Sequence, residues 1–253
     1  MDRECLKPLN VAWRAIAAVD VVIAGAIVCA QGAPDPMVAS ALKVLNRAPG
    51  LFAVYAARAG GTLTVVTELT PQSIRSGRWK DGADVDLTLS DAEDEVVGNA
   101  HGRVGGDSNA VALTVQISGT PVRATVRVRD ARGTAADGIT LDPSGGALIG
   151  DPLVSRSSSR VAAHPAADFE FARNEQIKVT WPVLAPLEHR AVRLLDRNGR
   201  PIPAELPLAE AADRKSLTLQ MGLSGFPTGE YLIELTAAGG AASERKMLAV
   251  RIK

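Results

Sequence analysis

Cysteine is nearly absent from this chain, and what little there is lies at one end. The 253 residues include two cysteines, Cys5 and Cys29. No stretch after Ala30 can therefore form a disulfide or offer a thiolate to a metal ion. If the first thirty residues are removed during maturation, the working protein contains no cysteine at all.

Aromatic residues and net charge are also scarce. Phe, Trp and Tyr make up 4% of the residues, so a core must be built mainly from Val, Leu, Ile and Ala. The 28 basic residues balance the 28 acidic ones. A neutral chain has no long-range field that attracts nucleic acid or an anionic membrane, which argues against both partners. The length suffices for one large or two ordinary domains.

The first thirty residues have the pattern of an export signal. Arg3 and Lys7 precede an apolar run, Ala15–Ala30, that is interrupted by Asp20. The run is too short for a comfortable membrane span, which needs about twenty residues. We predict a signal peptide over residues 1–30 and a secreted, periplasmic or cell-envelope protein that touches the membrane only if this segment stays uncleaved. A buried N-terminal helix, or a start codon upstream of the true domain, is the alternative.

Residues 31–50 predict a connector with one short helix. Asp35 is suited to the N-cap and Pro36 to the first turn, and apolar residues follow at helical spacing. The helix should end before Pro49-Gly50.

From residue 51 to residue 143 the apolar period changes to two, which is typical of strands with one buried face. The predicted strands of this first sandwich are Leu51–Ala57, Thr62–Leu69, Val85–Ser90, Glu95–Ala100, Val111–Ile117 and Val122–Arg129. Short strands separated by turn residues favour a sandwich over alternating strands and helices.

Residues 144–167 are rich in Gly, Ser and Pro, and we predict a linker there. The period of two resumes over 168–253, the predicted second sandwich. Its expected strands are Ile177–Val183, Ala191–Leu195, Ile202–Leu208, Leu217–Leu223, Tyr231–Thr236 and Met247–Ile252. The turn Asp196–Gly199 should join the second and third of these strands into a hairpin.

Phe226–Tyr231 forms a tight corner ending in a tyrosine, which is similar to the tyrosine corner of immunoglobulin-like domains. We therefore predict an all-β chain of two immunoglobulin-like or fibronectin-like antiparallel β-sandwiches, preceded by a short helical or signal segment.

Four segments, one of which contains this corner, share their order and turn chemistry with a known family. They are Ala124–Gly133, Leu148–Val154, Phe171–Val179 and Phe226–Leu235. In these places the chain resembles the C-terminal β-sandwich region of bacterial VWFA-related (von Willebrand factor type A-related) proteins. The resemblance implies a secreted chain with a type A-like domain upstream. The Asp-x-Ser-x-Ser metal motif of that domain is missing from this sequence, so metal-dependent ligand binding is not carried over.

The histidines and acidic residues are the candidate metal ligands. The three histidines, His101, His164 and His189, lie in separate turn or linker regions without zinc-motif spacing, so we expect exposed loop histidines. The acidic cluster comprises Asp81, Asp84, Asp86, Asp91, Glu93, Asp94 and Glu95.

Loops at the end of a sandwich can bind calcium when carboxylates converge, and Asp81, Asp84, Asp91 and Asp94 are the candidates. The chain has no Asp-x-Asp-x-Asp-Gly loop, which favours a solvated acidic turn over a calcium site. We predict no cofactor.

Nucleophilic catalysis finds little support in the sequence. Gly-x-Ser-x-Gly does not occur, and Gly222–Gly225 lacks the strand-to-helix context of a nucleophile elbow. We therefore predict no catalytic residues and no enzyme activity.

Two surface features are candidates for binding. Arg123, Arg127 and Arg129 lie on one face of one strand, where a charged outer face that hinders edge pairing is favoured over contact with an acidic partner. Trp79 lies in a polar loop, where an exposed ring could stack on a glycan.

These observations predict a non-catalytic secreted or cell-envelope module. It would act as a structural spacer or contact an unidentified protein partner through loops and edge strands. One alternative is a calcium-stabilised carbohydrate or matrix-binding module using the Asp81–Glu95 loops. Another is an accessory domain of an envelope enzyme.

Overall fold

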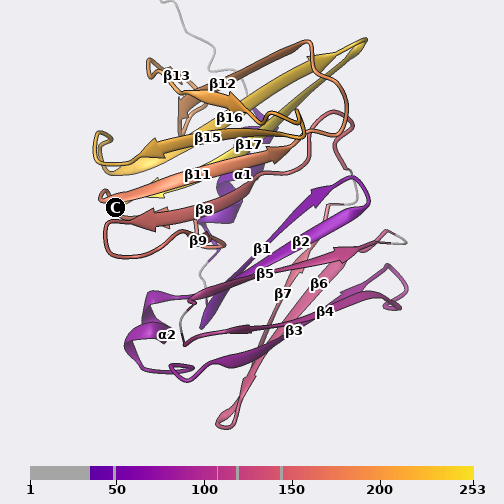
Figure 1. The fold of residues 1–253 in the computed structure, drawn as a ribbon, viewed down its shortest axis with the longest axis vertical. Coiled ribbons are helices and arrows are strands. Elements are labelled where there is room, and N and C mark those ends of the chain that lie inside the picture. Colours follow the sequence, from indigo (N-terminus) through magenta and orange to yellow (C-terminus); the bar gives the residue numbers. More distant parts are fainter. Residues whose placement is uncertain (1–34, 48–49, 107, 118–119, 143–144) are drawn as a thin grey trace, which may run out of the picture. The chain divides into compact units, whose positions relative to one another are not determined.

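The computed structural model of the chain describes residues 35–47, 50–106, 108–117, 120–142 and 145–253. Pro34–Lys253 form one compact unit. The described part is almost entirely antiparallel β-structure with two short helices, which confirms the predicted all-β fold (Figure 1). Within it, no helix is long and apolar enough to cross a membrane. The predicted export signal, residues 1–30, lies outside the described residues.

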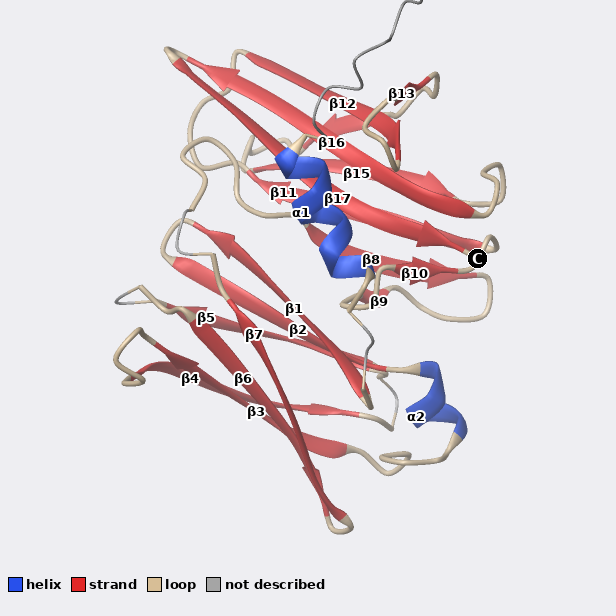
Figure 2. Cartoon of the chain, turned by 180° about the vertical axis from the view of Figure 1, so that it is seen from behind, coloured by secondary structure: helices blue, strands red, loops and turns tan. Residues whose placement is uncertain are grey.

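The N-terminal sandwich has one sheet of order β1-β2-β5 and another of order β4-β3-β6-β7 (Figure 2). Its strands are β1 (Phe52–Ala59), β2 (Thr62–Leu69), β3 (Ala83–Ser90), β4 (Val96–Val104), β5 (Ala110–Gln116), β6 (Arg123–Asp130) and β7 (Gly133–Thr140). A short helix, α2 (Pro71–Arg75), follows β2. In an immunoglobulin constant-type sandwich the fourth strand extends the sheet of the first, second and fifth. Here β4 pairs with β3, so it belongs to the opposite sheet.

Apolar side chains at every second position build the core of this sandwich. Val85, Leu87 and Leu89 of β3 are buried, and so are Val126 and Val128 of the neighbouring β6. The residues between them face outward, as a period of two requires.

β7 is a strand that the sequence does not predict. It contains two glycines, Gly133 and Gly138, and a single large apolar residue, Ile139, so its alternation is weak. It nevertheless pairs with β6 along its whole length. Strand preference depends strongly on context, and an edge position beside a well-formed neighbour suffices here.

The C-terminal sandwich follows the immunoglobulin strand order more closely. Its strands are β8 (Leu153–Ser158), β9 (His164–Pro165), β10 (Glu170–Phe171), β11 (Glu175–Pro182), β12 (His189–Asp196), β13 (Pro201–Ile202), β14 (Leu208–Glu210), β15 (Ser216–Gly222), β16 (Gly229–Gly239) and β17 (Ala242–Ile252). One sheet has the order β14-β15-β11-β8-β9 and the other β10-β17-β16-β12-β13. With β8, β11, β12, β14, β15, β16 and β17 taken as A to G, these are the sheets ABED and CFG of an immunoglobulin domain.

The segment predicted as a linker, 144–167, contains β8 and β9 of this sandwich. β8 pairs with β11 over six residues, so the segment is more than a connection. Val154 is the one fully buried side chain of β8, and the rest are serines, a leucine and Arg156. Arg156 packs its guanidinium over the ring of Phe171 at 4.4 Å. The guanidinium of Arg156 therefore covers this ring from a position where the period of two would place an apolar side chain, which hides that period.

The predicted hairpin after β12 is shorter than expected. β13 pairs with β12 through Pro201 and Ile202 only, and the chain then crosses to β14 in the other sheet. Pro203 and Pro207 follow, and a proline has no N–H to donate to a ladder. The turn itself is as predicted, because the Asp196 side chain accepts backbone hydrogen bonds within it.

The tyrosine corner is confirmed. The Tyr231 hydroxyl donates a hydrogen bond to the carbonyl oxygen of Pro227 at 2.9 Å. The ring of Phe226 lies edge-on to Tyr231, with centroids 6.0 Å apart. The corner sets the direction in which the chain enters β16.

The predicted short helix is α1 (Pro36–Leu45), and Asp35 caps it by accepting a hydrogen bond from Met37 N at 2.9 Å. Although it precedes the N-terminal sandwich in the chain, α1 packs on β17 of the C-terminal sandwich (Figure 2). Val38 and Leu45 are buried in that core.

An ionic chain holds the start of α1 to the same sheet. Arg245 of β17 binds the carboxylate of Asp35 and also lies 3.3 Å from Glu234, which is 2% exposed. Glu234 accepts two further hydrogen bonds from Arg193 of β12, at 2.9 and 2.6 Å. The buried carboxylate is therefore paired on both sides.

Candidate functional site

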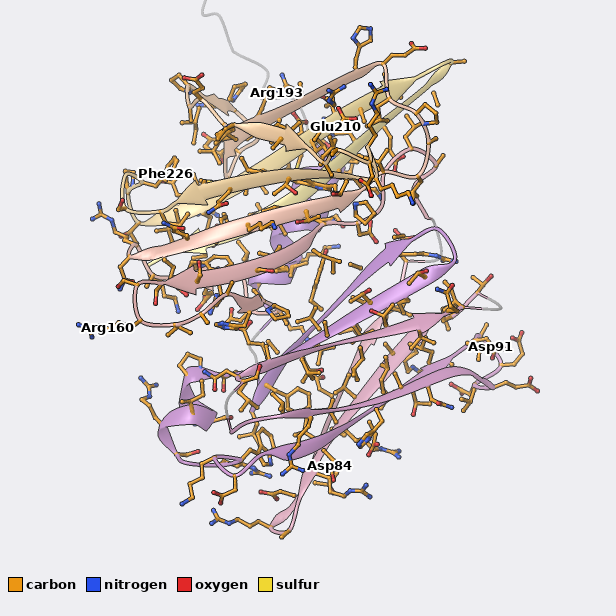
Figure 3. All side chains as sticks on the ribbon, viewed as in Figure 1. Asp84, Asp91, Arg160, Arg193, Glu210 and Phe226 are labelled. Carbon is orange, nitrogen blue, oxygen red and sulfur yellow. The ribbon has the colours of Figure 1, made fainter. Side chains whose placement is uncertain are left out.

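The predicted calcium ligands do not come together. Asp84 and Asp91 lie at opposite ends of β3, roughly 23 Å apart at about 3.3 Å per residue (Figure 3). Asp84 pairs with Arg103 at 3.3 Å and Asp94 with Arg123 at 2.8 Å. No group of three or more His, Cys, Asp or Glu side chains that could hold a metal ion occurs among the residues the structure describes.

Asp91 and Asp81 make local contacts instead. Asp91 Oδ1 accepts hydrogen bonds from the N–H groups of Glu93 and Glu95, at 3.1 and 2.9 Å, and so closes the turn between β3 and β4. The carbonyl oxygen of Asp81 accepts a hydrogen bond from Arg103.

The arginine row lies on the exposed face of β6, opposite acidic residues of β3. Asp86 lies 3.6 Å from Arg129 and 2.9 Å from His101 Nδ1. In the strand register Asp86 is the partner of Arg127. All these side chains are exposed, so each pair contributes at most about 1 kcal/mol. The row forms a charged outer face, the arrangement that the sequence favoured.

The histidines lie in strands, and the turn positions predicted for them are wrong. His101 is exposed in β4, and His189 is exposed at the start of β12. His164 belongs to β9 and is half-buried beside Glu68. The three rings lie on different strands of different sheets.

Trp79 is not available for a glycan. The side chain is 2% exposed and packs against Phe52, with ring centroids 6.1 Å apart. Arg78 covers the ring at 4.8 Å. The polar residues around Trp79 in the sequence suggested exposure, but the large ring fills the end of a core that is poor in aromatics.

The most distinctive polar group is a buried carboxylate between the two sandwiches. Glu68 of β2 is 4% exposed. Its Oε2 atom accepts hydrogen bonds from Ala167 N at 2.7 Å and from Asp168 N at 2.8 Å. Its Oε1 atom lies 3.2 Å from Nη1 of Arg156 in β8. One side chain of the N-terminal sandwich thus binds three groups of the C-terminal sandwich.

Arg156 is itself held on several sides. Its Nη2 atom donates to the carbonyl oxygens of Asp168 and Glu170, at 2.8 and 2.6 Å. Its Nε atom lies 3.6 Å from Glu175 of β11. A buried ion pair contributes to stability only when its remaining donors and acceptors are satisfied, as most of them are here.

His164 and Asp168 complete this group of polar residues between the sandwiches, which we call the junction together with Glu68 and Arg156. His164 Nε2 lies 3.7 Å from Glu68 Oε1, and this carboxylate raises the pKa of the imidazole above its usual range. The other ring nitrogen, Nδ1, lies 3.1 Å from the Ala162 carbonyl oxygen. Burial raises the pKa of the Asp168 carboxyl. The Glu68 carboxylate contributes to both shifts, whereas burial raises the pKa of Asp168 and opposes the rise in the pKa of His164.

We expect the contribution of His164 to stability to fall as the pH rises. Its pKa is higher in the folded protein than the ordinary value of 6.5, so folding favours the protonated ring. The stabilisation is complete below that ordinary value and is lost as the pH rises through the folded-state pKa. Urea unfolding of the wild type and of His164→Gln should therefore show the largest difference in free energy near the acidic end of the range.

The matched control for this experiment is His189→Gln, which changes an exposed histidine away from the junction. A wild-type advantage over His164→Gln that stays constant or grows with pH would contradict the assignment.

β1 makes further contacts with the C-terminal sandwich beside the junction, through an aromatic pair and through the carboxylate of Asp151. The rings of Tyr55 and Phe169 meet edge-on with centroids 4.8 Å apart, and the Tyr55 hydroxyl donates to Pro152 O at 2.8 Å. Burial raises the pKa of the Tyr55 hydroxyl. Asp151 accepts a hydrogen bond from Arg58 N at 3.0 Å and pairs with Lys246 at 2.8 Å.

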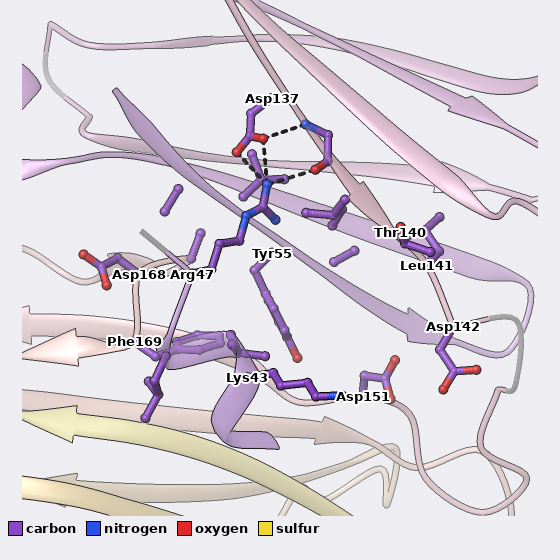
Figure 4. A pocket seen from close by; sticks show the side chains of 18 of the residues that line it. Lys43, Arg47, Tyr55, Asp137, Thr140, Leu141, Asp142, Asp151, Asp168 and Phe169 are labelled. Atoms are coloured by element: carbon purple, nitrogen blue, oxygen red, sulfur yellow. Dashed lines mark hydrogen bonds and ion pairs between the residues drawn. The ribbon is translucent and has the colours of Figure 1, made fainter. Parts of the chain in front are cut away.

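A cavity of about 590 Å³ lies beside these contacts (Figure 4). Its lining comes from the end of α1, from β1, from β7 and from residues 167–170 of the C-terminal sandwich. Arg47 reaches the edge of β7, where its Nη2 atom binds both carboxylate oxygens of Asp137, at 2.6 and 2.7 Å, and the Gly138 carbonyl oxygen at 2.9 Å. The volume is within the range of pockets that bind ligands.

Sequence reasoning missed Glu68, Arg156 and Phe169 as a group. A faint signal exists, since Glu68 is the one charged residue of the strand predicted over Thr62–Leu69. Its partners Arg156 and Ala167 lie about 90 to 100 residues further on, in the predicted linker, and Asp168 directly follows that segment. The junction is suited to holding two domains together, because its charges bind each other and the backbone.

No known family matches the sequence, and no curated protein matches it. An I-band fragment of titin aligns with 82% of this chain and 66% of its own length, at 13% identity and a TM-score of 0.25. A tandem pair of titin Ig domains aligns with 79% of this chain and 98% of its own length, at 11% identity and a TM-score of 0.25. Murine CEACAM1b aligns with 80% of this chain and 100% of its own length, at 9% identity and a TM-score of 0.24. Scores this low carry no argument, so the fold rests on the strand pairing described above.

Proposed function

We propose that the protein is a non-catalytic module that holds two β-sandwiches at a fixed spacing and presents the region around their junction to a partner protein. The observation that carries the proposal is the Glu68 carboxylate. It is buried, and its bonds to Arg156, Ala167 and Asp168 all cross from one sandwich to the other. A flexible tether between independent domains does not need such a group.

Burying charged groups between two surfaces costs desolvation free energy, which is offset only while the ion pair keeps its geometry. Once Glu68 and Arg156 are withdrawn from water, separating them leaves each charge to be solvated again or left unpaired. Tyr55 and Phe169 add an apolar contact beside the ion pair. Together these contacts favour one arrangement of the sandwiches over a range of arrangements.

The proposed setting is the cell envelope or the exterior. It rests on the signal-like residues 1–30. N-terminal sequencing of exported protein decides this, with Gln31 expected as the first residue and Met1 as the contrary result. Kinship with VWFA-related proteins belongs to the same proposal, and a type A domain encoded directly upstream would support it.

The fixed spacing can be measured with two spin labels, one on each sandwich. Arg132→Cys lies in the exposed turn between β6 and β7, and Arg197→Cys lies in the exposed turn after β12. Cys5→Ser and Cys29→Ser remove the native thiols. Pulsed electron paramagnetic resonance should give one narrow distance distribution in the full chain.

A label pair within the N-terminal sandwich, Glu93→Cys with Arg132→Cys, provides the reference width for a rigid body. If the distribution between the sandwiches is much broader than this reference, the two domains move independently and the proposed spacer role is wrong.

A further inference from the structure

β1 is an edge strand with one side unoccupied. It pairs with β2 along its whole length, and the sheet order β1-β2-β5 leaves its other side without a strand. Edge strands expose rows of backbone N–H and C=O groups that can bind another chain. Charged side chains often protect such edges, and the centre of β1, which reads Ala53-Val54-Tyr55-Ala56, carries none.

Contacts at the end of β1 show which backbone N–H and C=O groups of this strand point away from β2. Arg58 N donates to the Asp151 side chain, and Arg58 O accepts a hydrogen bond from Asp151 N at 2.8 Å. Both backbone groups of Arg58 therefore point away from β2. Alternate residues of a strand direct their backbone groups to the same side, so those of Val54 and Ala56 point outward too. Within the described residues, nothing binds these four backbone groups.

These outward groups face the cavity rather than a flat surface. Val54 and Ala56 both line it, together with Gly138 and Thr140 of β7. β7 is the edge strand of the other sheet, and its edge is partly closed because Arg47 occupies the Gly138 carbonyl oxygen. The open hydrogen-bonding edge of the cavity is thus β1, with β7 as the opposite wall.

We propose that the outer edge of β1 receives an extended segment of a partner polypeptide, which adds to the sheet by hydrogen bonds to Val54 and Ala56. A strand added there would lie about 4.8 Å from β1, the usual spacing in a sheet. Strand addition to an exposed edge is a recurrent mode of peptide recognition. The inference names the partner class for the interaction role proposed above, and rests on that proposal only for the biological purpose of binding.

The residues that line the cavity determine which types of side chain the bound segment can carry. Residues of an added strand alternate between the two faces of β1, so half would face Leu63 and Leu141 of the N-terminal core. The other half would face Tyr55 and Phe169 at the junction. The cavity is also lined by charged residues, among them Lys43, Arg47, Asp151 and Asp168. The positions of the segment that meet the apolar residues therefore carry small or aliphatic side chains.

Backbone recognition is tested on the full wild-type chain with a defined probe. The peptide acetyl-Thr-Val-Thr-Val-Thr-Val-amide is titrated, and the amide resonances of Val54 and Ala56 are followed by NMR. Two matched peptides carry N-methyl groups on the three valines or on the three threonines, so each has one hydrogen-bonding edge blocked. We expect binding that shifts both resonances, and one methylated peptide that binds roughly tenfold more weakly than the other.

A pair of variants tests the same edge from the side of the protein. Val54→Pro removes an outward N–H and leaves the bonds between β1 and β2 intact, since these use Ala53 and Tyr55. Val54→Ala is the matched control, because it shortens the side chain and keeps the N–H. We expect Val54→Pro to bind the probe roughly tenfold more weakly than Val54→Ala. Should the proline variant not fold, the methylated peptides still decide the question.

Three results would overturn the proposal. The first is no binding of the probe at millimolar concentration, and the second is equal binding of both methylated peptides, which would make the cavity a site for apolar side chains alone. The third is dimerisation of the chain that Val54→Pro abolishes, which would assign the edge to a second copy. Broad spin-label distances would contradict the fixed spacing without altering any of these outcomes, so the two proposals fail separately.

Discussion

Glu68→Ala is expected to lower the free energy of unfolding by about 3–5 kcal/mol, the usual effect of removing one partner from a buried ion pair. The substitution leaves Arg156 with a side chain that is 11% exposed and without its nearest carboxylate. It also removes the acceptor for Ala167 N and Asp168 N, which lie in the same buried region. The cost comes from the groups left behind more than from the contact itself.

Urea unfolding at neutral pH measures this effect, followed through Trp79 in the N-terminal core and Trp181 in the C-terminal core. Glu93→Ala is the control, since it removes an exposed carboxylate from a turn of the same sandwich and should change the free energy by less than about 0.5 kcal/mol. A loss below about 1 kcal/mol for Glu68→Ala would mean that the junction is hydrated and does not hold the sandwiches together.

Phe169→Ala should be comparably destabilising, by about 3–5 kcal/mol, because it opens a cavity in a packed core. Phe169 is 3% exposed and belongs to the C-terminal core, while its ring also meets Tyr55 of β1. The substitution should therefore weaken the C-terminal sandwich and the junction at the same time.

A double-mutant cycle with Tyr55→Ala separates these two effects. Aromatic pairs at this distance usually contribute about 0.5–1.5 kcal/mol beyond the area they bury, and we expect a coupling energy in that range. Phe226→Ala is the comparison, because Phe226 is only partly buried and pairs with Tyr231 within one sandwich. If Phe169→Ala costs no more than Phe226→Ala, the ring does not occupy the buried site described above.

The central strands could be predicted because their apolar residues alternate without interruption. β3 and β6 each have three or more buried residues at every second position. Any other register would expose these apolar side chains to water, which is unfavourable. β7 and β8 could not be predicted in this way. The first depends on its neighbour β6, and the second has the guanidinium of Arg156 over the Phe171 ring in place of an apolar contact. Such strands become visible only when their partners are known.

The junction was beyond sequence reasoning for a related reason. The Glu68 carboxylate meets the backbone N–H groups of Ala167 and Asp168, and a backbone donor has no sequence signature. The acidic residues from Asp81 to Glu95 were conspicuous by number, whereas the carboxylate that matters most is a single one inside an apolar strand. A lone charged residue in a predicted strand is thus a stronger sign of a buried polar contact than a cluster of acidic residues in a turn.

The attachment of α1 to β17 has a mechanical consequence. Asp35 and Lys253 bound the described chain, and both belong to elements packed in or beside the C-terminal sandwich. The N-terminal sandwich is therefore inserted between the helix and the domain on which the helix docks. Tension applied between these two points would load the contact of α1 with β17 before it reached the inserted sandwich. Only release of the helix would bring that sandwich into the line of force.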